Sequence, residues 1–133
     1  GPEAWRRLAR WAKSVGVDPD RERRFSIGHD DPAIAPAERV RLDACMVLDG
    51  DPPPGDDEGV RIEGIGGGAY ARLVHRAHIA KVGNAFGYLY GRWLAGSGRE
   101  LRDAPTLMEH LGPRTLFGPS RKTAVLLPIE SVA

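Results

Sequence analysis

The chain has 133 residues, of which 41% are hydrophobic, and its 19 basic and 18 acidic residues leave a net charge of +1. This composition suits one domain able to bury its own core, and the lack of a basic stripe argues against a nucleic-acid surface. Cys45 is the only cysteine and no apolar run reaches 18 residues, so we expect a cytoplasmic domain without disulfides or membrane contact.

The first expected element is a helix over residues 4–15, because its apolar residues recur on one face and Gly16 follows them. A short strand is expected at 24–28, followed by a loop from residue 29 that is rich in proline and aspartate. The next strand is expected at 40–48, where Leu42, Ala44 and Met46 share one face.

Residues 50–59 combine three prolines with four acids and indicate a linker between two halves. Strands at 59–65 and 69–76 are expected to meet at a turn over the glycines 66–68, because the sequence around them lacks a phosphate-loop motif. A second helix follows at 82–94, then strands at 107–111 and 123–129. Pro128 suggests that the last strand lies at an edge or contains a bulge.

The second half of the chain repeats the first. The matching pairs lie 81 or 82 residues apart: Ala4, Trp5 and Leu8 with Ala85, Phe86 and Leu89; Gly16 with Gly98; Phe25 with Leu107; Asp43 with Ala124. We therefore expect a single domain over 1–133, with module one at 3–49, a linker at 50–58 and module two at 59–131. Two repeats are too few for an open solenoid, so they should close on each other, with a ligand cleft where they meet.

Segments over nearly the whole chain resemble the GyrI-like effector-binding domain, which occurs alone and at the C-terminus of bacterial AraC-type transcription regulators. In order, these segments are EAWRRLARWA, IGHDDP, RLDACMVL, DEGV, GGGAYARLVHR, LYGRWL, SGRELRDAP and LLPI. The resemblance implies an α+β fold in which two pseudo-symmetric strand-and-helix modules form a concave antiparallel sheet with two helices and a central cleft.

The chain departs from the family pattern at its start. The family has a strand ahead of the first helix, whereas this chain opens on the helix, so we expect module one to lack its first strand. That loss would leave a sheet edge with unpaired backbone groups, which a second copy of the chain could cover. We therefore expect a homodimer as one solution.

Glu109 is the main candidate site residue, because it alternates with Leu107 and Leu111, an expensive position for a carboxylate that has no partner. One explanation is a structural ion pair with Arg92 or Arg114. By resemblance, Glu109 instead matches the family's cavity glutamate in a Glu-x-Tyr strand, although Leu111 replaces the tyrosine. In the cleft, Glu109 could pair with a cationic ligand.

Aromatic and flexible side chains supply the other candidates for ligand contact. The residues Phe86, Tyr90 and Trp93 form a helical stripe that is typical of a core, but the resemblance favours stacking on a ligand for Tyr90 and Trp93. The full set of expected ligand-binding residues is Glu109, Trp93, Tyr90, Phe86, Trp11, Tyr70, Met46 and Leu107, with Trp5 assigned to the core.

The leading functional hypothesis is a binding domain for hydrophobic, planar or cationic small molecules, serving as the sensor of a multidrug-type transcription regulator or as a stand-alone relative. Two alternatives stay open. One is a hydrolase of cyclopropane-bearing or other strained aromatic natural products, with Glu109 as catalytic residue. The other is a gyrase-inhibitor-type protein-interaction module.

We expect neither a metal nor another cofactor. His75 and His78 are three residues apart at the end of a strand, Cys45 stands alone, and no zinc-ligand spacing is met. A serine or cysteine nucleophile signature is also lacking.

Overall fold

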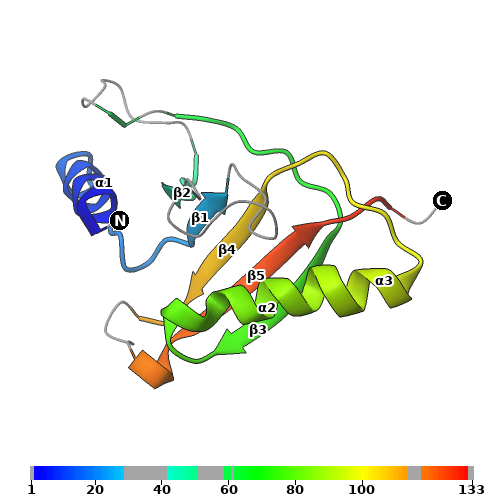
Figure 1. Ribbon diagram of the computed structural model, residues 1–133. Helices are drawn as coiled ribbons and strands as arrows, with labels where there is room; N and C mark the ends of the chain where they lie inside the picture. The colour runs from blue at the N-terminus through cyan, green and yellow to red at the C-terminus, as the bar shows by residue number, and fades with distance from the viewer. Residues whose placement is uncertain (1, 29–41, 51–58, 61, 114–117, 132–133) are drawn as a thin grey trace.

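The computed structural model describes residues 2–28, 42–50, 59–60, 62–113 and 118–131. The elements in chain order are α1 (Pro2–Ser14), β1 (Arg24–Gly28), β2 (Leu42–Met46), β3 (Tyr70–Arg76), η2 (Ile79–Lys81), α2 (Val82–Tyr88), η3 (Leu89–Trp93), α3 (Leu94–Ser97), β4 (Thr106–Leu111), η4 (Gly118–Ser120) and β5 (Lys122–Pro128). Their strands form one antiparallel sheet in the order β2-β1-β4-β5-β3 (Figure 1). The predicted α+β fold is confirmed.

The pairing of β1 with β4 at the centre of the sheet reflects the internal repeat of the sequence. Strands β1 and β4 lie side by side, with Ser26 opposite Met108, and these two residues are related by the 82-residue offset of the repeat. The flanking pairs are Arg24 with His110 and Gly28 with Thr106, so each module presents the same positions to the other. The Ser26–Met108 pair therefore lies on an approximate twofold axis between the modules.

The outer strands break this symmetry. Among the described strands, β2 flanks β1 as β5 flanks β4, and a further strand, β3, follows on the side of module two but not on that of module one. Within the described residues, β2 pairs with β1 alone. Strand β2 is therefore an edge of the sheet as far as the described residues show.

Both main helices pack on one face of the sheet. Phe86 and Leu89, on α2 and η3, belong to a core cluster with Met108 and Val125. On the other side of the axis, the Trp5 ring of α1 meets the ring of His110 edge-on. Met108 and His110 are two apart on β4 and so share a face, which we call the helix face. Figure 1 shows α2 crossing β5 and β3, and α1 beside β2.

Glycines in the left-handed conformation end both helical segments. Gly16 has φ +82° and Gly98 has φ +71°, a region that residues with a Cβ rarely adopt. After α1, the Val17 amide donates to the Ala12 carbonyl at 2.8 Å, which satisfies an orphan acceptor of the last turn. The second helical segment runs from α2 through the π-helical turn η3 to α3, extending past residue 94.

Two expectations about strands are wrong. The segment 59–65 forms no strand in its described residues, because it is exposed and has no pairing partner there; Ile62 and Ile65 are each 49% exposed. Strand β5 is central rather than at an edge, and Pro128 is simply its last residue, where its carbonyl accepts from the Arg102 amide. The expected loop at 29–39 and most of the linker, residues 51–58, lie outside the described residues.

Candidate functional site

Four residues surround the twofold axis on the face opposite the helices, which we call the Glu109 face. In the register, Phe25 of β1 lies opposite Glu109 of β4, and Ile27 lies opposite Leu107. Ile27 and Glu109 are 8% and 9% exposed, whereas Phe25 and Leu107 are half-buried. We call Phe25, Ile27, Leu107 and Glu109 the central quartet. It places one carboxylate among apolar side chains at the junction of the modules.

Glu109 is paired with an arginine that the sequence analysis did not name. Arg23, just before β1, donates from Nε to Oε2 at 2.9 Å and from Nη2 to Oε1 at 3.1 Å. The hydrogen bond to Glu109, and then its charge, raise the pKa of Arg23 above its usual value. The same guanidinium stacks over the Phe25 ring, 5.0 Å from its centroid. A planar cation therefore sits against both a carboxylate and an aromatic ring.

The two members of this ion pair differ in exposure. The Glu109 side chain is 12% exposed, whereas that of Arg23 is 66% exposed. The carboxylate is thus fixed in the sheet, and its partner can turn toward water. Neither of the expected partners holds this position: Arg92 is exposed on η3, and Arg114 lies outside the described residues.

The structure divides the expected ligand-binding residues between two faces. Leu107 and Glu109 share the Glu109 face with Tyr70, which lies at the far end of the sheet with the Arg102 guanidinium 4.9 Å from its ring centroid. The others are on the helix side: Phe86, Tyr90 and Trp93 in or against the core cluster, Met46 on the helix face of β2, and Trp11 in α1, 5% exposed. The sheet therefore separates the carboxylate from the aromatic stripe.

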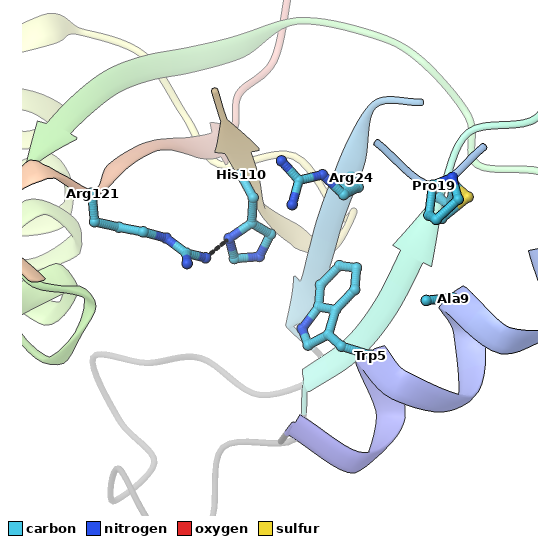
Figure 2. Close-up of a pocket in the computed structure, with 7 residues that line it drawn as sticks. Trp5, Ala9, Pro19, Arg24, His110 and Arg121 are labelled. Atoms are coloured by element: carbon cyan, nitrogen blue, oxygen red, sulfur yellow. Dashed lines mark hydrogen bonds between the residues drawn. The ribbon is translucent and has the colours of Figure 1, made fainter. Parts of the chain in front are cut away.

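A pocket of about 160 Å³ opens on the helix face, between α1 and the sheet (Figure 2). Its lining residues are Trp5, Ala9, Pro19, Arg24, Met46, His110 and Arg121. Met46 is the only one of them among the expected ligand-binding residues. Trp5, which the sequence analysis assigned to the core, is a wall of this pocket.

His110 organises one wall of the pocket. Arg121 Nη2 lies 2.7 Å from Nδ1, and because a guanidinium can only donate, Nδ1 is the acceptor and the proton is on Nε2. Nε2 then donates to Ser26 Oγ at 2.8 Å. Burial, together with the charges of Arg121 and Arg24, lowers the pKa of His110 to about 4. The imidazole is therefore neutral and fixed in one tautomer near pH 7.

A family model described as the GyrI-like small molecule binding domain matches residues 2–129, almost the entire chain. The chain belongs to the GyrI-like family. No curated protein matches it significantly. The family assignment supports small-molecule binding in general terms. At the twofold centre of this GyrI-like domain lies Glu109, the one charged side chain among the described residues that is buried.

Metal ligation, membrane crossing and thiol reactivity are the other features to consider in the described part of this GyrI-like domain. No group of three or more His, Cys, Asp or Glu side chains there could hold a metal ion, and no described helix has the length and apolar character to cross a membrane. Burial, with Asp43 and Glu63 nearby, raises the pKa of the half-buried Cys45 thiol to about 11. Cys45 is thus a poor nucleophile at neutral pH.

The sequence held a signal for the Arg23 partner. The repeat offset makes Ile27 the counterpart of Glu109, and antiparallel pairing about the axis then sets Phe25 opposite Glu109. Arg23 precedes Phe25 by two residues, so it belongs to the same face. The pocket residues gave no comparable signal, because they come from six separate parts of the fold.

Proposed function

We propose that this GyrI-like domain binds a planar, cationic small molecule on the Glu109 face, with Glu109 as the charge partner and the central quartet as the apolar contact surface. The domain would serve as the ligand sensor of a transcription regulator or as a stand-alone binder. The observation that carries the proposal is the position of the Arg23 guanidinium. This planar cation lies against both the Glu109 carboxylate and the Phe25 ring, as the ligand would.

The apolar surroundings support this assignment. Half-buried Phe25, Leu107 and Leu111 lie on the same face as the carboxylate, so a flat ligand could bury apolar area while its charge meets Glu109. A charge-assisted hydrogen bond in partly buried surroundings contributes about 1.5–3 kcal/mol.

Binding requires the displacement of Arg23 from Glu109. The Arg23 side chain is 66% exposed and that of Glu109 only 12%, so leaving the carboxylate without any partner would cost about 1–3 kcal/mol. The ligand would replace one cation by another, so Glu109 would never be left without a partner. In the free domain Arg23 would act as a displaceable stand-in for the ligand.

Binding ranks ahead of hydrolysis for a geometric reason. Both oxygens of Glu109 accept hydrogen bonds from the Arg23 guanidinium, so the observed partner of this carboxylate is a planar cation. Each oxygen keeps further acceptor capacity, so the ion pair favours cation binding as the leading function without ruling out a bound water. A DNA-binding domain joined to this chain in the full-length protein would favour the regulator over the stand-alone binder.

The experiment is titration calorimetry with N-methylacridinium, a permanent planar cation, and acridine, its neutral counterpart above about pH 7. Glu109→Gln should weaken N-methylacridinium binding by roughly 1.5–3 kcal/mol and acridine binding much less. Glu100→Gln, which removes an exposed carboxylate elsewhere, is the matched control. Arg23→Ala should strengthen binding of the cation, because the internal competitor is gone.

Equal losses for the cation and the neutral compound in Glu109→Gln would reject the charge pair. Unchanged or weaker cation binding in Arg23→Ala would reject the view of Arg23 as a stand-in for the ligand.

A further inference from the structure

The pocket on the helix face differs in charge from the Glu109 face. Among the described residues that line the pocket are two arginines and no acid, and the histidine among them, His110, is neutral. Arg24 and Arg121 reach the pocket from β1 and from the residue before β5 (Figure 2). The described lining of this pocket therefore carries two basic side chains, although the net charge of the whole chain is only +1.

Each of the two guanidinium groups donates to a neutral acceptor. Arg24 Nη2 donates to the Gly112 carbonyl at 2.6 Å, and Arg121 Nη2 donates to His110 Nδ1 at 2.7 Å. A guanidinium has five N–H donors, so a single such bond leaves Arg121 able to donate to a ligand. The bond to His110, which Ser26 anchors from the other side, fixes the direction in which it can do so.

The remaining walls are apolar, and they set the size of the occupant. Trp5 and Ala9 come from α1, with Pro19 and Met46 beside them. A volume of about 160 Å³ is close to the roughly 150 Å³ of an engineered cavity that accepts benzene, and well below the roughly 300–1,000 Å³ of pockets for drug-sized ligands. The space suits one aromatic ring.

We propose that this pocket is a second ligand site, specific for a small single-ring aromatic carboxylate, with Arg121 as its charge partner and Trp5 as its ring contact. Guanidinium groups bind carboxylates through paired N–H donors, and the indole supplies a flat apolar wall. His110 is a positioning residue, since it holds Arg121 and stays uncharged near pH 7. The proposal is independent of the Glu109 face, which lies on the opposite side of the sheet.

The test uses three probes that share one ring: benzoate, benzamide and benzamidine, which are an anion, a neutral amide and a cation. Each is titrated into the ¹⁵N-labelled domain at pH 7, and the indole N–H signal of Trp5, assigned with Trp5→Phe, reports on the pocket. Benzoate should move this signal with an affinity at least about tenfold above that of benzamide. Benzamidine should leave the signal unchanged.

Variants then assign the charge partner. Arg121→Gln should weaken benzoate binding about tenfold or more, whereas Arg92→Gln, which removes an exposed arginine on η3, should leave it unchanged. Glu109→Gln should also leave benzoate binding unchanged, because Glu109 lies on the other face of the sheet. A failure of this pocket proposal can therefore be told apart from a failure of the proposed cation site. Trp5→Leu, a second variant in case Arg121→Gln does not fold, should weaken benzoate binding.

Three results would overturn the proposal. They are equal affinity for benzoate and benzamide, equal effects of Arg121→Gln and Arg92→Gln, and benzoate binding that survives Trp5→Leu intact.

Discussion

Arg23→Ala should destabilise the domain although Arg23 is mostly exposed, because the substitution leaves the largely buried Glu109 carboxylate without its hydrogen-bond donor. Glu109 has a side chain only 12% exposed, and without Arg23 neither oxygen has the donor it now uses. A buried acceptor left without a partner costs about 1–3 kcal/mol. The gap left by Arg23 admits some water, so we expect about 1–2 kcal/mol. For a domain of this size that lowers Tm by roughly 3–8 °C.

Arg21→Ala is the matched control. Arg21 pairs with Asp18 at 3.6 Å, and both side chains are exposed, at 86% and 53%. Exposed pairs contribute roughly 0–1 kcal/mol, so this variant should differ little from the parent. Urea unfolding at pH 7, followed by far-UV circular dichroism, would measure both variants on one scale.

Glu109→Leu, alone and combined with Arg23→Ala, gives a double-mutant cycle for this ion pair. Replacing a buried ion pair by apolar side chains is often neutral or stabilising, and leucine already occupies positions 107 and 111 on this strand. The variant should be about as stable as the parent, and adding it to Arg23→Ala should restore most of the lost stability. An Arg23→Ala variant no less stable than Arg21→Ala, or a double variant without recovery, would show that Glu109 does not need its partner.

Two further predictions concern acid stability and association. His110 has a folded pKa of about 4 against an ordinary 6.5, so between these pH values the unfolded chain binds more protons than the folded one. The free energy of unfolding should therefore fall as the pH is lowered from 6.5 toward 4, and His110→Gln should make this fall shallower. An unchanged pH profile in His110→Gln would contradict the assignment. Strand β2 pairs only with β1 in the described residues, so its other edge should pair with a second copy of the chain. Sedimentation should then show a species heavier than 14.4 kDa, and a strand-forming N-terminal extension should shift it toward monomer. A monomer without the extension would reject association through β2.

Periodicity in the sequence predicted most elements of the fold. The strand at 24–28 was predicted with its observed bounds, and the first helix was placed within two residues of α1 at each end. Such segments succeed because their apolar spacing matches a single type of element. The segment 59–65 failed because Ile62 and Ile65 resemble strand residues locally, whereas a strand also needs a neighbour to pair with.

The candidate site was less predictable because it depends on tertiary docking. Alternation along 107–111 correctly set Glu109 apart from Met108. It could not say that α2 packs over Met108, which removes Tyr90 and Trp93 from the carboxylate. The Arg23 pair and the Arg121–His110 contact join residues 86 and 11 positions apart, and no local pattern specifies such pairs.

The approximate twofold axis through Ser26 and Met108 has a consequence for orientation. The counterpart of Glu109 in module one is Ile27, so the duplicated scaffold offers two equivalent places but only one negative charge. A ligand with its charge at one end would therefore gain more from lying one way across the axis than from lying the other way. The substitution Ile27→Glu would make the centre pseudo-symmetric and allow both orientations, at the cost of a second acid near the first. A single carboxylate on a nearly twofold-symmetric scaffold would thus set the orientation of a bound ligand.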